Sequence, residues 1–371
     1  MIRNVIIGCG ISGAITARIL ADRFGENSLA IDARPHIGGN CYDFYDQNHI
    51  CIHKYGAHIF HTDLQPVWEY LNRFTQWHPY MHKVLGVIDG QYVPIPFNLN
   101  SIRMTFPDFL ARRLEEKLVI RFGFGSKVSI WELRKSEEKD LVFLANYIYK
   151  KVFLGYTQKQ WGVTPDNLEP AVLDRVPVCV SYDDRYFQNR WQGIPKHGYT
   201  AMLSSILDHP RITVKTDTSW NDVKEEFQAS GIRIFYTGAV DELMGWRFGE
   251  LPYRSVKQDF QEYNREFFQT SAVVNYPENY DFTRISEYKH FLGDQSPRTV
   301  ISFEYPSAWK RGENDPAYPV AGEENTRLHQ RYREAAREEY GDIHFLGRLG
   351  DYRYYDMDKA VERVFSVMEA L

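Results

Sequence analysis

The stretch from residue 3 to residue 32 constrains the fold more than any other part of the chain. A short apolar run, VII at residues 5–7, leads into the glycine pattern GCGISG at residues 8–13. Apolar residues then recur at helical spacing, and a second apolar run ends on Asp32. This order of strand, glycine turn, helix, strand and acid is typical of a βαβ unit that binds a dinucleotide.

Each position in the pattern has a physical task. Glycines permit the tight turn, the close approach of a pyrophosphate and the packing of the helix on the sheet. The start of the helix offers free N–H groups and the positive end of its dipole to phosphates, and the acid can accept a ribose hydroxyl. A tight turn without a ligand is the alternative. We predict cofactor contacts at Gly8, Gly10, Ile11, Ser12, Gly13 and Asp32.

A second glycine pair, Gly38-Gly39, follows shortly after the acid and precedes an irregular loop. A nicotinamide-binding domain usually continues into another βα unit, so this arrangement favours the FAD-binding subtype of the fold, with an ordinary turn as the alternative. Further along, the buried run GIRIFYTG ends on Gly238, and a glycine at the end of a strand suits a position beside a cofactor.

Composition excludes several classes of function. A chain of 371 residues predicts two or three substructures, and a net charge of −5 implies no general affinity for nucleic acid. The four cysteines form no CxxC pair, which favours reduced thiols in a cytoplasmic protein. No apolar run approaches a membrane span, and the chain starts directly on a predicted strand, which leaves no room for a signal peptide.

Three histidines, His53, His58 and His61, invite a metal interpretation. His58 and His61 form an HxxH pair, but the only acid nearby is Asp63 and no cysteine is near enough to complete a ligand set. The Gly-Ala step at residues 56–57 also argues against a helix that would align the pair. We predict no metal site, and we expect these histidines to pack near a cofactor or in the core.

The pattern of apolar and polar residues changes several times along the chain. Residues 98–160 carry apolar residues at intervals of three and four and predict a helical insertion. Residues 157–198 are rich in glycine, proline and polar residues, typical of a long functional loop. An α/β pattern returns at residue 199, residues 251–305 alternate like antiparallel strands, and HFLGRLG predicts a last strand before a helix for which Asp356 is a candidate N-cap.

In this order and spacing, the motifs of the whole chain resemble those of the bacterial UDP-galactopyranose mutases. The motifs are GCGISG, RPHIGGN, KYGAHIFHTD, GYTQKQWG, RVP, RYFQNRWQGIPKHGYT, FYTG, TRISEYKHF, AYPV and GRLGDYRYYDM. The resemblance implies an α/β protein with a discontinuous, Rossmann-like FAD-binding domain (1–80, 193–250 and 325–371). It also implies a helical-bundle insertion (98–160) and an antiparallel β-sheet domain (81–97, 161–192 and 251–324), with a mobile loop at about 161–186.

The family reaction implied by this resemblance is the reversible isomerisation of UDP-galactopyranose and UDP-galactofuranose, which supplies galactofuranose for cell-surface glycans. The N-acetylated sugar is a further candidate substrate. Ring contraction requires the anomeric carbon to be held while UDP is away, and N5 of reduced flavin can form that covalent adduct. A cofactor that carries the chemistry also explains why the sequence shows no obvious catalytic triad or carboxylate pair.

The resemblance assigns roles to individual residues. Arginine suits a departing diphosphate because it is always charged and can bind in a bidentate manner. The catalytic residues implied are Arg175, Arg284 and His61. The substrate-binding residues implied are Tyr156 (stacking on uracil), Phe153, Trp161, Tyr186, Tyr318, Tyr354, His58 and the two arginines. The remaining cofactor contacts implied are Arg34, Asn40, His58, His61, Arg348, Tyr354, Asp356 and Met357.

Two other classes of function share part of this pattern. An FAD-dependent oxidoreductase, such as an amine-oxidase-like enzyme, would share the glycine pattern and Asp32, but it needs no diphosphate clamp of the kind that Arg175 and Arg284 suggest. A nucleotide-sensing module without catalysis would leave the closing loop unexplained. The resemblance also implies a homodimer, with no nucleic-acid or membrane partner.

Overall fold

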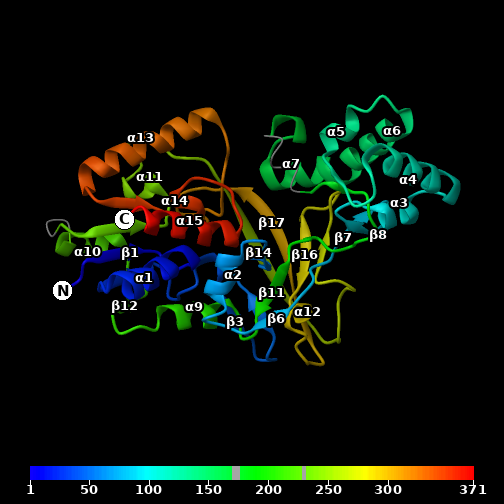
Figure 1. Cartoon of the computed structure of the whole chain (residues 1–371). Coiled ribbons are helices and arrows are strands. Elements are labelled where there is room, and N and C mark those ends of the chain that lie inside the picture. The colour runs from blue at the N-terminus through cyan, green and yellow to red at the C-terminus, as the bar shows by residue number, and fades with distance from the viewer. Residues whose placement is uncertain (169–175, 228–230) are drawn as a thin grey trace.

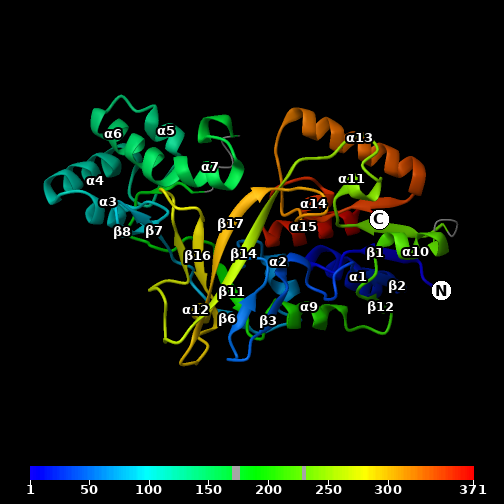
Figure 2. The ribbon, with the colours of Figure 1, turned by 180° about the vertical axis from the view of Figure 1, so that it is seen from behind.

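The computed structural model describes residues 1–168, 176–227 and 231–371 as a mixed α/β protein (Figure 1). One end is a parallel sheet with helices on both faces. The other end is a group of helices. A long twisted sheet lies between the two ends, and it is seen there both from the front and from behind (Figure 2).

The parallel sheet has five strands in the order β12-β2-β1-β13-β19. They are β12 (Ile212–Lys215), β2 (Ser28–Ile31), β1 (Asn4–Ile7), β13 (Arg233–Tyr236) and β19 (Ile343–Phe345). All neighbouring pairs are parallel, which explains why the central strands read as continuous apolar runs: both of their faces are covered. Three separate stretches of chain therefore build one sheet.

Two apolar cores cover the faces of this sheet. One contains buried residues of α1 (Ile11–Phe24), α9 (Tyr199–Leu207) and α15 (Met357–Glu369). The other contains buried residues of α10 (Trp220–Phe227), α11 (Val240–Leu243) and α13 (Glu323–Tyr340). The arrangement is a doubly covered, Rossmann-like layer structure.

The second large sheet has seven strands in the order β18-β14-β17-β16-β15-β7-β8. They are β18 (Tyr318–Pro319), β14 (Tyr253–Tyr263), β17 (Thr299–Ala308), β16 (Arg284–Glu287), β15 (Val273–Asn275), β7 (Val84–Ile88) and β8 (Gln91–Ile95). Its pairs are antiparallel except for β15 with β7. This explains the alternating pattern of residues 251–305.

The helical end begins at Asn98, whose side chain forms a capping box with Ser101 at the start of α3 (Leu99–Thr105). It continues with α4 (Asp108–Phe122), α5 (Ile130–Arg134), α6 (Lys139–Ile148) and α7 (Gly155–Trp161), and a π-helical turn (Tyr149–Leu154) separates the last two. Buried leucines and isoleucines at helical spacing form its core.

Smaller elements connect these parts. They are β3 (Asp43–Tyr45) paired with β4 (Cys51–His53), β5 (Phe60–Thr62) and β6 (Trp77–Pro79) on either side of β11 (Trp191–Pro195), β9 (Lys127–Val128) paired with β10 (Val178–Cys179), α2 (Gln65–Leu71), α12 (Lys289–Leu292), α14 (Gly347–Gly350) and the 3-10 turns Gly39–Cys41 and Pro165–Asn167.

Two details differ from the sequence-based expectations. The described part of 161–192 gives no strand to the seven-stranded sheet, because β10 pairs with β9 and β11 pairs with β5 and β6. The run HFLGRLG is a strand only to Phe345 and then turns into α14. Asp356 stands at the predicted N-cap of α15, where its side chain makes no capping hydrogen bond. The four cysteines are free and buried, and no helix in the described ranges is long and apolar enough to cross a membrane.

Candidate functional site

The glycine pattern forms a close backbone junction at the end of β1. Gly8 has φ +104°, which favours glycine, and a Cβ on Gly13 would lie 1.9 Å from the Gly8 carbonyl oxygen. A Cβ on Gly39 would lie 2.9 Å from Cα of Gly10, so the two glycine pairs are in mutual contact. No side chain caps α1 and no acid lies in its first turn, so its N-terminal N–H groups are available to an anion.

Asp32 lies at the end of β2 and is buried. Its carboxylate accepts hydrogen bonds from the backbone N–H of Cys9 (2.8 Å) and of Arg34 (3.0 Å). These bonds fix the glycine turn against the second strand. Each carboxylate oxygen keeps a further lone pair, so the predicted ribose contact is compatible with this arrangement and stays a prediction.

A cavity of about 510 Å³ opens beside this junction. One wall comes from residues 55–61 and from Arg348 to Met357, another from α7 and the segment 186–189, and the floor from the seven-stranded sheet. The cavity thus reaches from the cofactor end of the parallel sheet to the helical end. Sites between substructures are typical ligand sites.

The floor carries a row of four polar side chains across adjacent strands. Gln258 pairs with Glu304, Glu304 with Arg284, and Arg284 with Asn275, in strands β14, β17, β16 and β15. All four line the cavity. Both amide atoms of Gln258 and Oδ1 of Asn275 are buried without a partner among the described residues. Buried polar atoms of this kind usually have partners, so this floor is suited to a polar ligand.

Arg284 is the cation of this row. Its Nε lies 3.2 Å from Oε2 of the buried Glu304, and its Nη2–H donates to the hydroxyl of Tyr156 on α7. Burial opposes the charge, but the Glu304 carboxylate and the hydroxyl groups of Tyr156 and Tyr318 together outweigh burial and raise the pKa of Arg284. Because the guanidinium has five N–H donors, most remain for an anionic ligand.

A second cation, Arg348, lies among aromatic rings. Its guanidinium carbon is 4.9 Å from the ring centroid of Tyr318 and 5.2 Å from that of Tyr354, within cation–π range. Trp161 at the end of α7 lies 6.3 Å and 5.8 Å from the same two rings. Three separate segments therefore converge on the cavity with hydroxyl, indole and guanidinium groups.

Two histidines of the cavity, His58 and His61, differ in their contacts. Burial lowers the pKa of His58 to about 4, so the ring is neutral at physiological pH. Its Nδ1 donates to the Gly56 carbonyl oxygen (2.7 Å), which leaves Nε2 as an acceptor. His61 stacks on Phe187 at 3.6 Å between centroids, and its Nδ1 donates to Oδ1 of Asn189 (3.0 Å).

The structure brings most of the predicted residues together. The cavity is lined by Arg34, Asn40, His58, His61, Tyr156, Trp161, Tyr186, Arg284, Tyr318, Arg348, Tyr354, Asp356 and Met357. The glycine-rich group and Asp32 lie beside it at the ends of β1 and β2, with Gly238 just after β13. Arg175 lies outside the described residues.

Phe153, predicted to bind substrate, lies outside the cavity lining. Its side chain is buried in the apolar core. It belongs to the π-helical turn before α7.

Sequence reasoning missed several lining residues, among them Gln258, Asn275, Glu304 and His82. Burial lowers the pKa of His82 to about 3. Glu304 could have been suspected from its place in the alternating strand opposite the strand of Arg284. Nothing in the local sequence distinguishes the two amides from ordinary polar positions of a strand.

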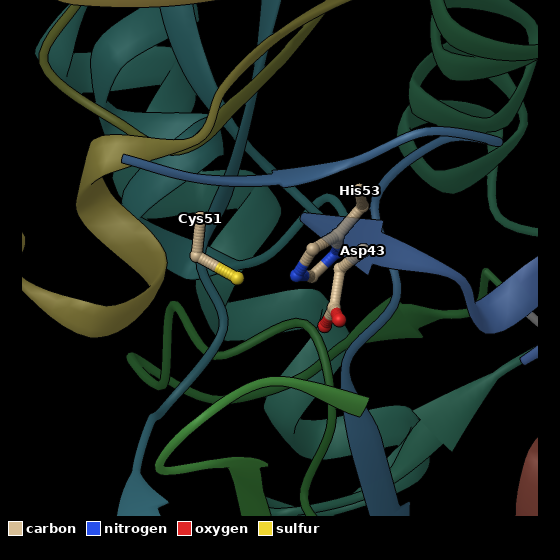
Figure 3. A group of neighbouring side chains, drawn as sticks. All are labelled: Asp43, Cys51 and His53. Carbon is tan, nitrogen blue, oxygen red and sulfur yellow. The ribbon is translucent and has the colours of Figure 1, made fainter. Parts of the chain in front are cut away.

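One cluster beside the site has the composition of a metal centre. Oxygen, sulfur and nitrogen atoms of Asp43, Cys51 and His53 lie within 4.8 Å of one another and face a common point (Figure 3). However, Nδ1 of His53 accepts the His58 N–H (3.0 Å), so Nε2 carries the proton and has no lone pair for a metal. Asp43 accepts the backbone N–H groups of Tyr199 and Thr200 at the start of α9, and burial raises the pKa of the Cys51 thiol. The cluster supports the backbone around His58.

Comparison with known proteins agrees with this geometry. The profile of the UDP-galactopyranose mutase family matches residues 151–354, and that of NAD(P)-binding Rossmann-like domains matches residues 6–74. A probable UDP-galactopyranose mutase of Klebsiella pneumoniae is 38% identical over 96% of this chain and 91% of its own length. The chain belongs to the UDP-galactopyranose mutase family. It is therefore an isomerase.

Two further similarities concern the range of substrates among relatives and the fold. A dTDP-fucopyranose mutase of Escherichia coli is 35% identical over 98% of this chain and 96% of its own length, so family members differ in both nucleotide and sugar. The crystal structure of a reduced UDP-galactopyranose mutase superimposes with a TM-score of 0.71, covering all of this chain and 94% of the other. At 15% identity, that match shows the fold.

Proposed function

We propose that the protein is an FAD-dependent mutase that interconverts UDP-galactopyranose and UDP-galactofuranose. The observation that carries the proposal is the position of Arg284. A half-buried guanidinium, paired with Glu304 and bonded to Tyr156, lies on the floor of the cavity that begins at the dinucleotide junction. An enzyme that must release and recapture a nucleoside diphosphate needs a cation at this place.

The residues present fit FAD. The glycine junction requires glycine, because Cβ atoms on Gly13 or Gly39 would contact the backbone of Gly8 or Gly10. The uncapped start of α1 beside it offers N–H groups to a pyrophosphate. Arg34 and Asn40, joined by a 3.0 Å hydrogen bond, follow Asp32 along the same wall. His58, His61, Arg348 and Met357 would surround the flavin end.

When bound, reduced flavin would supply a nucleophilic nitrogen, N5, to the anomeric carbon of the sugar. The protein supplies position and charge. Arg284 and, as we propose, Arg175 stabilise the diphosphate as it leaves, and Tyr318 and Tyr354 donate hydroxyl hydrogens to it. Tyr156 stacks on uracil, Tyr186 contacts the nucleotide, and Trp161 closes over the sugar. Neutral His58 offers an acceptor at Nε2 without adding charge.

The exposed apolar residues of the helical end support a homodimer. Phe109 and Ile120 of α4 are 72% and 77% exposed, and Phe124 directly after this helix is 64% exposed. Burial of such a group against a second copy would remove apolar surface from water. We propose that this face forms the contact between two copies.

The test is a product assay with three sugar nucleotides. The yellow protein is reduced chemically and incubated with UDP-galactopyranose, its N-acetylated analogue or dTDP-fucopyranose, and the products are separated by chromatography. We expect the furanose form of UDP-galactose with no net oxidation of the sugar. Conversion of dTDP-fucose alone would refute the proposed substrate, and stoichiometric oxidation of a substrate would indicate an oxidoreductase instead.

A further inference from the structure

Helix α7 carries two of the proposed substrate contacts, Tyr156 and Trp161, and between them it carries a lysine with no role in the reaction described so far. The side chain of Lys159 leaves the helix three residues after Tyr156, on the same side of the short helix. Its ammonium group has three N–H donors and lies within hydrogen-bond distance of four backbone carbonyl oxygens, which share these donors: those of Tyr276, Glu278 (3.1 Å), Tyr280 (3.1 Å) and Phe282 (3.0 Å).

These four carbonyl groups belong to one turn, residues 276–283, which joins β15 to β16. The strand before the turn ends at Asn275 and the strand after it begins at Arg284, and these two residues are paired in the polar floor row. A backbone bond from the Tyr276 N–H to the Thr283 carbonyl (2.8 Å) closes the turn. The ammonium therefore occupies the centre of the turn that leads into Arg284.

Two further contacts hold α7 against this turn and against strand β14. A Cβ on Gly155 would lie 2.2 Å from the Pro277 carbonyl oxygen, so the start of α7 is in direct backbone contact with the turn. At the other end, Arg254 of β14 donates from Nε to the Gln160 carbonyl (2.7 Å) and from Nη2 to the Lys159 carbonyl (3.0 Å). The unpaired carbonyls of a helix end are thereby satisfied by a cation.

We propose that Lys159 is a positioning residue for substrate binding: its ammonium, held in the carbonyl cage of residues 276–282, sets the distance between Tyr156 and Arg284. The proposal rests on the proposed function, because it assumes that these two residues hold the base and the diphosphate of one nucleotide. Charged hydrogen bonds are the strong ones, and a cage of four carbonyl dipoles without a cation would be self-repelling. Loss of the ammonium would let the turn move away from the helix. Arg284, which follows the turn, would then move away from Tyr156 on the helix.

The test compares Lys159→Met and Lys159→Ala with wild-type holoenzyme, using UDP as the probe in calorimetric titrations of the oxidised protein. We expect the Kd for UDP to rise at least tenfold in both variants, with the flavin spectrum unchanged, and KM to change more than kcat in the reduced enzyme. The matched control is Lys150→Met, which removes an exposed lysine from the preceding turn and should leave the Kd unchanged.

A chemical rescue separates the cage from simple packing. Methylammonium chloride should restore UDP affinity to Lys159→Ala in a saturable manner, whereas tetramethylammonium chloride at the same ionic strength should not. Lys159→Met should not respond, because its side chain fills the cage. If either variant loses its flavin or fails to fold, Arg254→Met serves instead. It removes the second anchor of α7 and should also raise the Kd for UDP.

The outcomes are distinct. A Kd for Lys159→Met or Arg254→Met within twofold of wild type would overturn the positioning role. Weakened binding in Lys159→Ala without any response to methylammonium would overturn the cage. Failure of the wild-type holoenzyme to bind UDP would refute the proposed function, and the inference that rests on it.

Discussion

Replacement of Arg284 by glutamine should separate its role in binding from its role in stability. The guanidinium faces the cavity and donates to Tyr156, and at least one further N–H is free to bind phosphate. A hydrogen bond to a charged group is worth about 1.5–3 kcal/mol. Arg284→Gln should therefore raise the Kd for UDP by about 10- to 150-fold, measured by calorimetric titration, and nearly abolish turnover.

The same change leaves the Glu304 carboxylate buried without its cation, 3.2 Å from where Nε was. Breaking a fully buried pair costs about 3–5 kcal/mol, and the cost here should be smaller because the arginine side chain is 31% exposed. The melting temperature of Arg284→Gln should fall, and the double variant Arg284→Gln with Glu304→Gln should regain most of it.

The double variant is the sharp control because it repairs the buried charge without restoring a cation. It should melt near wild type and still bind UDP weakly. Recovery of UDP affinity in the double variant, or a Kd for Arg284→Gln within twofold of wild type, would show that Arg284 does not contact the diphosphate.

Four more predictions concern other parts of the structure. Tyr156→Ala should weaken UDP binding and leave the flavin spectrum unchanged, because Tyr156 lines the cavity and we propose that its ring contacts the nucleotide base; a shifted spectrum would contradict this. Gly13→Ala should abolish flavin retention, read from the absorbance ratio of the purified protein, because its Cβ would meet the Gly8 carbonyl at 1.9 Å. Burial lowers the pKa of His53 to about 3, so below pH 6.5 the unfolded state binds more protons than the folded state and stability falls as the pH is lowered. Between about pH 6.5 and 4, His53→Phe should remove about 1.4 kcal/mol per pH unit from this loss of stability. The plot of melting temperature against pH should therefore be flatter for the variant than for wild type. Phe109→Glu should yield monomers in light scattering, and an unchanged mass would refute the proposed contact.

The sequence was most informative where the chemistry is local. The glycine turn, the first helix and Asp32 follow one another along the chain. The structure shows a direct backbone requirement for glycine at Gly8, which has φ +104°, and at Gly13, whose Cβ would lie 1.9 Å from the Gly8 carbonyl oxygen. The motif around Arg284 likewise identified a residue of the cavity.

What the sequence could not give depends on long-range pairing. The floor row of Gln258, Glu304, Arg284 and Asn275 exists only because four strands align in one register. A single polar residue in an alternating strand looks like any exposed position. The burial of Phe153 in the apolar core likewise depends on packing against distant segments, which its local sequence does not show.

The measurement that tests the central claim most directly compares one preparation of the protein in two oxidation states. UDP-galactopyranose is added to the flavin-loaded protein before and after chemical reduction, in the absence of oxygen, and UDP-galactofuranose is quantified by chromatography. We predict conversion to equilibrium with reduced flavin and none with oxidised flavin. Equal conversion in both states, or conversion by protein that holds no flavin, would contradict the account.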